Sequence, residues 1–472
     1  MDMLKHSATR LAELLREDGL SSLELVEHCL DRIRRLDDEL QAFVSVDEEG
    51  ARRRAETCDA RRRRGEPLGP LHGLPVAIKD VTATAGLRTT QGSRLLSDHV
   101  PAEDALSVAR LKRAGAIVLG KTNTPEFAFG AVCTNALRGP TANPWDTRLT
   151  SGGSSGGSAV AVATGMVPLA QGTDFGGSVR TPAAFCGCVG LRPTPGVIAE
   201  PSRPLGWSTL ATQGVLARGV EDAALMLAAM AGEHQDDPSS RGMAWPAPST
   251  ALERPLKVAV SVTLGDAYPV EPEVRAAFQD AVAGLEAALG PVAREHPDVG
   301  GGVEAFKTLR AAESWLTFGE LVRDHADRLT PSFVWNVEQG RHTGAEAYLR
   351  AERTRTALYR RFFAFLSRFD VLALPATSVL AFPNAQEEVW EIDGQRCESI
   401  IDYLACTFLI SLVGFPVVTL PASRRPGEKR FGIQLVARPG NEALLLQAAL
   451  RLERQGFRHH WPPLAAPNAG ES

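Results

Sequence analysis

The chain has 472 residues, of which 44% are hydrophobic and 23% are charged, as is ordinary for a globular protein. This length allows a large buried core and fits either one large domain or several small ones. The formal net charge of −5 argues against a general nucleic-acid-binding protein, because such proteins need a positive surface field.

The first part of the chain predicts helices followed by a short strand. The opening 15 residues lack the apolar core of a signal peptide and have the spacing of an amphipathic helix. Ser21 and Glu24 form a capping box at the start of the next helix. Arginine-rich runs at 52–54 and 61–64 are interleaved with acidic residues, so we expect a solvated helix face there. An apolar strand is predicted at 76–79.

Strands and helices alternate from there to the C-terminus. A helix from about Asp104 to Gly115 precedes a strand at 117–119, and Gly165 is placed to end a small apolar helix at 158–164. Further strands are predicted at 258–261, 371–374, 417–420 and 431–436. Further helices are predicted near 220–231, 272–289, 345–368 and 441–455. This alternation favours an α/β architecture in which helices cover a central sheet.

The cysteines and the most apolar segment indicate a cytoplasmic protein. Seven cysteines are scattered along the chain, and only Cys186 and Cys188 lie close together. A single C-x-C pair without nearby histidines is a poor zinc site, so we expect reduced thiols and no metal. The uncharged segment at 405–420 is too short to span a membrane and contains Gly414 and Pro416. We therefore expect a buried helix and a buried strand there, and no membrane partner.

Two glycine-rich turns stand close together in the sequence. The run from Ser151 to Ser158 fits a linker, a phosphate-binding loop or a catalytic loop. It continues directly into an apolar helix, unlike a linker, and it lacks the lysine that a phosphate-binding loop needs. The second turn, from Asp174 to Ser178, contains two glycines that let backbone N–H groups converge, as an oxyanion hole requires.

The run GGSSGGSAVAVATGMVPLAQGTDFGGSVRTP at 152–182 closely resembles the amidase-signature family. Further similar segments are LHGLPVAIKD at 71–80, GKTNTPEFA at 120–128, NPW at 143–145, AAFCGCVGLRPTPG at 183–196, ARGVEDAALML at 217–227 and GFPVVTLPA at 414–422. The resemblance covers nearly the whole chain. It implies one amidase-signature domain over 1–472, with a central mixed β-sheet covered on both sides by helices. The signature core would lie at 70–230, and 257–465 would shape the substrate pocket.

Taken residue by residue, the resemblance implies a Ser-Ser-Lys triad. The sequence contains no evident metal-ligand cluster or phosphate-binding loop, so we expect no cofactor. Ser178 corresponds to the attacking serine, Ser154 to the bridging serine that follows a cis peptide bond, and Lys79 to the base. The main chain near Ala128 corresponds to a segment that lines the substrate site. The family's oxyanion hole corresponds to the backbone amides of Phe175, Gly176, Gly177 and Ser178.

The chemistry of these residues agrees with the implied roles. A serine needs a base, and we interpret His72, the one histidine near these motifs, as structural. Lys79 would have to be neutral, and lowering its pKa from about 10.4 to near 7 costs roughly 4 to 5 kcal/mol, which burial in an apolar strand supplies. Without the resemblance, a surface salt bridge with Asp80 would be the simpler interpretation of Lys79. We expect Asp80 to point to the opposite face, and Asp174 and Arg180 to hold the loop.

Three functions follow from these expectations. The first is an amidase that cleaves a small or medium carboxylic amide through a Ser178 acyl-enzyme; esters and carbamates are related substrates. The second is a protein like the glutamine-dependent amidotransferase subunit that supplies ammonia to a partner. That subunit type carries an acidic residue ten positions before the glycine equivalent to Gly414, where this chain has Leu404, with Asp402 displaced by two residues. The third is a noncatalytic binding protein, which the complete triad disfavours. Substrate identity and a homodimeric state are left open.

Overall fold

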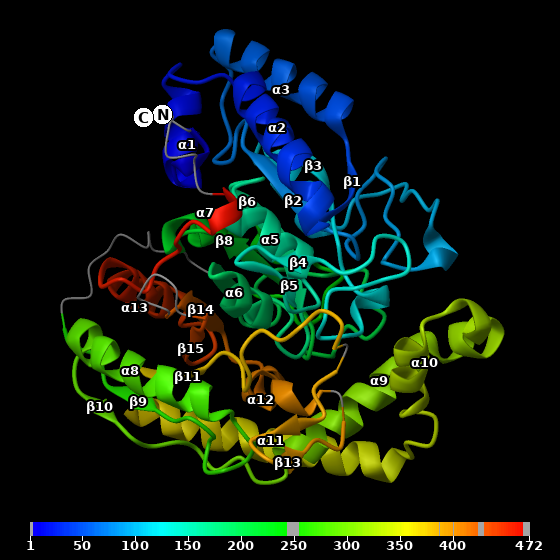
Figure 1. Cartoon of the computed structure of the whole chain (residues 1–472), viewed down its shortest axis with the longest axis vertical. Helices are drawn as coiled ribbons and strands as arrows, with labels where there is room; N and C mark the ends of the chain where they lie inside the picture. The colour runs from blue at the N-terminus through cyan, green and yellow to red at the C-terminus, as the bar shows by residue number, and fades with distance from the viewer. Residues whose placement is uncertain (1–2, 243–253, 387, 400, 423–428, 466–472) are drawn as a thin grey trace.

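A mixed sheet of eleven strands forms the centre of the computed structural model, which describes residues 3–242, 254–386, 388–399, 401–422 and 429–465 (Figure 1). In spatial order the strands are β1 (Phe43–Val46), β3 (Ile117–Thr122), β2 (Pro75–Lys79), β6 (Leu169–Asp174), β8 (Thr212–Ala217), β7 (Val189–Arg192), β14 (Val417–Pro421), β15 (Gly432–Val436), β11 (Val371–Pro375), β9 (Val258–Val260) and β10 (Val292–Ala293). Short two-stranded sheets are formed by β4 (Ala142–Asn143) with β5 (Asp146–Thr150), and by β12 (Glu391–Ile392) with β13 (Gln395–Arg396).

The direction of neighbouring strands brings the candidate residues to one edge of the sheet. β3, β2 and β6 run parallel, whereas the central strands from β6 to β11 pair antiparallel. In the β2–β6 pair, Ile78 lies opposite Gln171. Lys79 is the residue after Ile78, and Thr173 lies two residues after Gln171. Both therefore lie at the C-terminal ends of their parallel strands.

Helices flank this sheet on both faces. On one face, α5 (Gly156–Ala163) and α6 (Arg180–Cys186) pack against each other and against the central strands. A second pair, α7 (Val220–Met230) and α13 (Glu442–Arg454), packs on β8 and β14, which α5 and α6 also contact. This arrangement confirms the predicted α/β fold with a mixed central sheet covered by helices.

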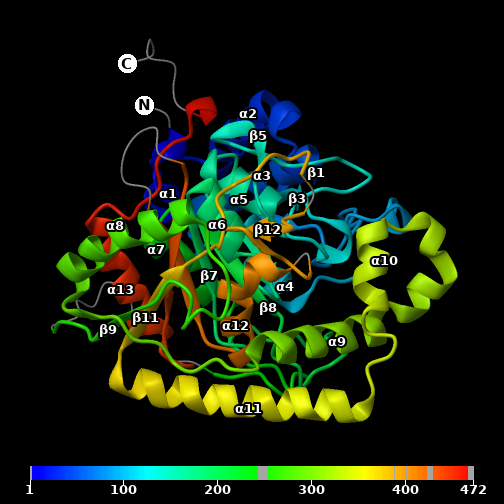
Figure 2. The ribbon, with the colours of Figure 1, turned by 60° about the horizontal axis from the view of Figure 1, so that its bottom comes forward.

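The remaining helices come from the two ends of the chain. The N-terminal part contributes α1 (Ala8–Arg16), α2 (Ser22–Leu40), α3 (Glu48–Arg63) and α4 (Leu106–Arg113), of which α3 contacts β3 while α1 and α4 contact α7. The C-terminal part contributes α8 (Pro272–Leu289), which contacts α13, and also α9 (Gly302–His325), α10 (Pro331–Glu338), α11 (Ala345–Arg368) and α12 (Ala405–Val413). Figure 2 shows α11 as a long helix along one side, with α9 beside it and α10 projecting outward.

Most of the predicted elements are present with shifted ends. The helix predicted at 345–368 has those bounds as α11, and the one at 158–164 begins two residues earlier as α5. The capping box of Ser21 and Glu24 is formed in both directions. Elements without a predicted counterpart include β6, β7, β8 and α9.

Three further expectations are confirmed locally. Both arginine-rich runs lie on or at the end of α3, where Arg52 pairs with Glu27 and Arg61 with Glu66. The seven cysteines are free thiols. The uncharged segment at 405–420 forms the buried helix α12 followed by β14. Within the described part of the chain, no helix combines the length and apolarity needed to cross a bilayer.

The glycines at the start of α5 allow this helix to pack closely on the neighbouring backbone. A Cβ at Gly157 would lie 2.4 Å from both the carbonyl oxygen of Ala42 and the backbone nitrogen of Asn123. Both obstacles are backbone atoms, so they could not move away without shifting β1 or β3. Gly157 is therefore needed for the close contact that places the preceding serine loop.

We predict that Gly157→Ala lowers the free energy of unfolding by about 1 to 3 kcal/mol through overpacking. In an open helix the same change would raise the free energy of unfolding by up to about 1 kcal/mol. A decrease therefore distinguishes overpacking from ordinary helix propensity. Gly344→Ala is a control for the steric contact, because a Cβ there meets nothing within 4 Å. Gly344 is the N-cap of α11, where alanine is less favourable than glycine, so this control should lose no more than about 1 kcal/mol. Urea unfolding of both variants measures the effect. Equal midpoints for wild type and Gly157→Ala would contradict the packing argument.

Candidate active site

Lys79, the last residue of β2, is fully buried, and its amine contacts hydroxyl groups. The Nζ atom lies 2.6 Å from the Oγ of Ser154 and 2.9 Å from the Oγ1 of Thr173. Thr173 belongs to β6, the parallel neighbour of β2. The sequence reasoning missed Thr173 because it did not predict β6. The structure thus brings Lys79 and Ser154 together as predicted, and it adds a threonine to the pair.

The electrostatic surroundings of Lys79 favour the neutral amine. Burial lowers its pKa to about 7, against smaller opposing effects of Cys133 and Asp174. Asp80 does not offset this shift, because its carboxylate accepts the backbone N–H of Thr90 at 3.1 Å and also binds the Thr90 hydroxyl. The expectation that Asp80 points away from Lys79 is therefore confirmed.

A second buried lysine has different partners. Burial also lowers the pKa of Lys121 to about 7. Its Nζ binds the carbonyl oxygen of Thr82 and lies 2.9 Å from the Oγ1 of Thr84. None of these contacts is a serine of the two glycine-rich turns, so Lys79 is the lysine placed for serine chemistry.

The two serine loops are joined by a direct backbone contact. The N–H of Ser155 donates to the carbonyl oxygen of Ser178 at 3.0 Å. The peptide bond between Gly153 and Ser154 is cis, as the family resemblance implied. Ser154 is buried beside Lys79, whereas Ser178 is half-buried and faces the same cavity. Ser178 is therefore the serine more accessible to a ligand, and Ser154 is the one that contacts the lysine.

A buried carboxylate shapes the turn that carries Ser178. Asp174 accepts the N–H groups of Gly177 at 3.0 Å and Val179 at 3.1 Å. It also pairs with Arg180 at 2.8 Å and Arg192 at 3.3 Å, with all three side chains fully buried. Burial alone would raise the pKa of Asp174, but these cations and N–H donors hold it well below its ordinary value. Asp174 and Arg180 thus hold the loop, as predicted.

The four backbone amides assigned to the oxyanion hole are not equivalent. The Gly177 N–H is engaged by Asp174, whereas those of Phe175, Gly176 and Ser178 have no acceptor among the described residues. Gly177 has a φ of 129°, and a Cβ there would lie 2.4 Å from the Oγ1 of Thr407. Gly177 therefore shapes the turn, and the other three N–H groups are available to a ligand.

A cavity of about 270 Å³ opens in front of these loops. Its wall includes Ser154, Thr173 and Ser178, together with the aromatic rings of Phe127, Phe129, Phe175, Phe306 and Phe408. Several lining residues come from α9 and from the segment 401–408, far from the serine loops in sequence. The cavity wall is therefore mostly apolar, with a few hydroxyl groups and one charged side chain, that of Arg310.

The backbone near Ala128 forms part of the cavity wall, as expected. Phe127 and Ala128 have positive φ values of 50° and 63°. The N–H of Phe127 donates to the carbonyl oxygen of Gln91 at 2.7 Å, and its ring packs 4.9 Å from the ring of Phe333. These contacts fix a backbone conformation that ordinary residues rarely adopt.

Other residues singled out in the sequence lie outside this cavity or differ from the amidotransferase pattern. His72 does not line the cavity, and its Nε2 lies 3.1 Å from the carbonyl oxygen of Cys58. Leu404 does line the cavity, whereas the Asp402 carboxylate pairs with Lys307 at 3.0 Å. The cavity wall thus presents an apolar side chain at the place where the resemblance implies an acid in the amidotransferase protein.

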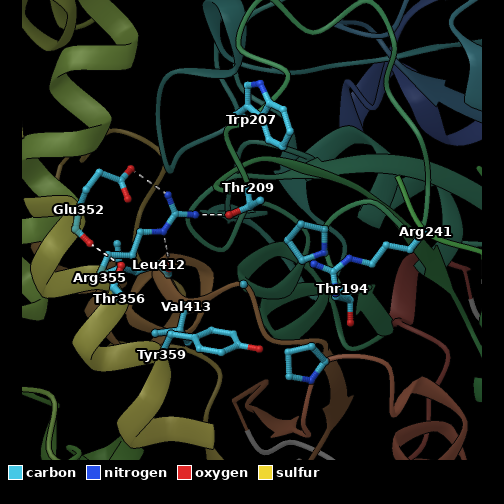
Figure 3. A pocket seen from close by; sticks show the side chains of 13 residues that line it. Thr194, Trp207, Thr209, Arg241, Glu352, Arg355, Thr356, Tyr359, Leu412 and Val413 are labelled. Carbon is cyan, nitrogen blue, oxygen red and sulfur yellow. Dashed lines mark hydrogen bonds and ion pairs between the residues drawn. The ribbon is translucent and has the colours of Figure 1, made fainter. Parts of the chain in front are cut away.

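Figure 3 shows a second hollow, of about 350 Å³, beside α11. In it the guanidinium of Arg355 contacts Glu352 and Thr209 and also donates to the carbonyl oxygen of Leu412. None of the predicted catalytic or substrate-binding residues lines this hollow. The chemistry predicted from the sequence therefore belongs to the smaller cavity.

We predict that Asp174→Asn lowers the free energy of unfolding by about 3 to 5 kcal/mol, because it leaves two buried arginines without a carboxylate. The depressed pKa of Asp174 means that its contribution is complete above about pH 4 and is lost only as the pH falls further. Chemical unfolding at pH 7 measures the change. Asp146→Asn breaks an exposed pair with Arg148 and should leave the midpoint almost unchanged. Similar midpoints for the two variants would refute this role of Asp174.

Comparisons with known proteins agree with this geometry. Residues 24–446 match the family model described as Amidase. The chain is 36% identical to a glutamyl-tRNA(Gln) amidotransferase subunit of Moorella thermoacetica, over 98% of this chain and 99% of that protein. It is also 36% identical to an acylamidase of Rhodococcus erythropolis, over 95% of this chain and 94% of that protein.

The fold agrees with the same family. A crystal structure of a bacterial aryl acylamidase belonging to the amidase signature enzymes matches with a TM-score of 0.90 and 26% identity. The match covers 98% of this chain and 99% of that one. This chain belongs to the amidase-signature family, as its sequence motifs predicted.

Proposed function

We propose that this protein hydrolyses a carboxylic amide through an acyl-enzyme on Ser178. The observation that carries the proposal is the buried Lys79 amine, which lies 2.6 Å from the Ser154 hydroxyl. With its pKa lowered to about 7 by burial, Lys79 is able to accept a proton near neutral pH. Ser178 lines the same cavity as Ser154 and is the more exposed of the two serines.

The proton moves along a relay in this mechanism. As Ser178 Oγ attacks the amide carbon, its proton passes to Ser154 Oγ, and the Ser154 proton passes to Lys79 Nζ. When the C–N bond breaks, the relay returns the proton to the departing nitrogen, which leaves as ammonia or an amine. Water then attacks the Ser178 ester while the same relay takes its proton, and the relay returns this proton to Ser178 Oγ as the acyl C–O bond breaks. The products are a carboxylic acid and the free serine.

Backbone N–H groups stabilise the negative charge that forms on the carbonyl oxygen. The amides of Phe175, Gly176 and Ser178 have no acceptor among the described residues, which supports this role. Gly177 contributes the turn, because its own N–H is directed to Asp174. Asp174, held by Arg180, fixes the turn before substrate binds.

A free-standing amidase fits the cavity better than an ammonia-supplying amidotransferase protein. The resemblance implies that the latter grips the amino group of glutamine with an acidic residue, and this chain has Leu404 at that place in the cavity. Asp402 is engaged elsewhere, by Lys307 and by the N–H groups of Glu398 and Ser399. Among the relatives, the acylamidase of Rhodococcus erythropolis supports this choice, whereas the amidotransferase subunits support the alternative.

We predict that purified wild-type chain alone releases amine or ammonia from a panel of aliphatic and aryl amides, with little activity on glutamine. A fluorophosphonate probe should label Ser178, and Ser178→Ala should lower kcat by several orders of magnitude because the covalent route is lost. Ser151→Ala is a control in the first glycine-rich run, since Ser151 does not line the cavity and its hydroxyl donates to the carbonyl oxygen of Thr141 at 3.0 Å. Labelling of Ser154 alone, or glutaminase activity that exceeds amide hydrolysis, would contradict the proposal.

The pKa of Lys79 sets the expected pH dependence. Only the neutral amine accepts a proton, so kcat/KM should fall about tenfold per pH unit below a midpoint near 7. The measurement uses a non-ionising amide from pH 5 to 10, with circular dichroism to verify that the protein stays folded. Full activity at pH 5 would exclude Lys79 as the base.

A further inference from the structure

Arg310 carries the only charged side chain among the described residues that line the catalytic cavity. It lies on α9 between Phe306, one turn earlier, and Ser314, one turn later, and both of these side chains also face the cavity. The rest of the wall is aromatic or aliphatic, apart from hydroxyl groups of the two serine loops, Thr173 and Ser314. A permanent positive charge in a mostly apolar wall is unfavourable unless an opposite charge lies beside it.

No carboxylate of the described residues pairs with Arg310. Its Nη2 donates to the Oδ1 of Asn336 at 2.7 Å, and the guanidinium lies 5.3 Å from the centre of the Phe129 ring. The Nε and Nη1 groups have no acceptor in the described part of the chain. Burial lowers the pKa of Arg310 to about 10, so the side chain is still cationic at neutral pH.

Three other buried or neighbouring cationic side chains, unlike Arg310, pair with carboxylates. Lys307, one turn earlier on α9, pairs with Asp402 at 3.0 Å. Arg180 and Arg192 share the buried carboxylate of Asp174. A purely structural Arg310 would use one of its five N–H donors in a neutral hydrogen bond and would make one ring contact. Neither contact supplies an opposite charge for this half-buried cation.

The position of Arg310 allows a ligand to reach it. Arg310 and Ile401 line both the catalytic cavity and an adjoining hollow of about 500 Å³. The guanidinium therefore stands at the border of the two spaces. A planar fork of N–H groups matches the two oxygens of a carboxylate.

We propose that Arg310 binds a carboxylate of the substrate, so that the preferred substrates are amides carrying an anionic group. This inference rests on the proposed function in one respect, namely that Ser178 cleaves an amide held in this cavity. The carboxylate belongs either to the acyl portion or to the amine portion of the amide. Both sources present the same chemistry to Arg310, and the experiment separates them.

The test compares matched substrates that differ by a carboxylate replaced with a methyl group. Glutaryl mono-p-nitroanilide is compared with pentanoyl p-nitroanilide for the acyl portion, and 4-acetamidobenzoate with 4-methylacetanilide for the amine portion. For wild type, we expect kcat/KM to be at least tenfold higher for the anionic member of one pair. The pair that shows the preference identifies which end of the amide Arg310 recognises.

Substitutions assign the preference to Arg310. Arg310→Met should lower the anionic-to-neutral ratio of kcat/KM at least tenfold, and Arg310→Lys should lower it less, because the charge is kept and the fork is lost. Arg323→Met also removes one positive charge from α9, but Arg323 lines neither space and lies beside Glu320, so the ratio should stay within twofold. The ratio is unaffected by partial loss of folded protein. A wild-type ratio near one in both pairs, or an unchanged ratio in Arg310→Met, would overturn the inference.

Binding to Ser178→Ala separates this inference from the proposed function. Calorimetry with the same four compounds should give at least tenfold tighter binding of an anionic member, and this difference should vanish in Ser178→Ala/Arg310→Met. Arg310-dependent binding without any hydrolysis by wild type would refute the proposed function and support the anion site. Hydrolysis with equal binding of charged and neutral members would support the function and refute the anion site.

Discussion

The buried ion pair between Asp174 and Arg180 connects the turn that carries Ser178 to β6, α6 and α12. Asp174 ends β6 and binds the turn that leads to Ser178, while Arg180 begins α6. Arg180 also donates to the carbonyl oxygen of Thr407 at 2.7 Å and the Oγ of Ser411 at 2.5 Å, both on α12. One guanidinium thus links the serine turn to α12, whose Phe408 lines the cavity. Because all these groups are buried, the turn cannot shift without breaking charged hydrogen bonds.

The fold was predictable wherever a segment showed one regular pattern of apolar residues. The bounds of α11 could be predicted because its apolar residues recur along one face of an otherwise charged helix. The central strands β6, β7 and β8 lack that signal, because close helix packing replaces large residues with glycines. A Cβ at Gly172 would lie 2.9 Å from the Oγ of Ser155, and one at Gly190 would lie 2.7 Å from the Cβ of Ala183. Helix α9 contacts α10, α11 and α12, so its apolar residues do not form a single stripe.

The candidate site was predictable in its reactive groups and not in its walls. Lys79, Ser154 and Ser178 lie in local motifs that a family resemblance identifies, and strand alternation was enough to direct Asp80 away from Lys79. Thr173 and Arg310 carry no motif. Thr173 becomes a partner of Lys79 only because β6 lies beside β2, and Arg310 reaches the cavity only because α9 packs there. Such residues depend on tertiary contacts between distant segments, which local spacing does not encode.

Lys79 and Arg310 have complementary electrostatic roles in the proposed reaction. Lys79 is buried among hydroxyl groups, so its neutral form is favoured, whereas Arg310 keeps its charge. An unpaired substrate carboxylate would stabilise protonated Lys79 and would repel the oxyanion that forms on the attacked carbonyl. In this proposal Arg310 neutralises that carboxylate, so an anionic substrate binds without raising the pKa of the base. A protein carboxylate beside Arg310 would remove this compensation, and the described residues provide none there.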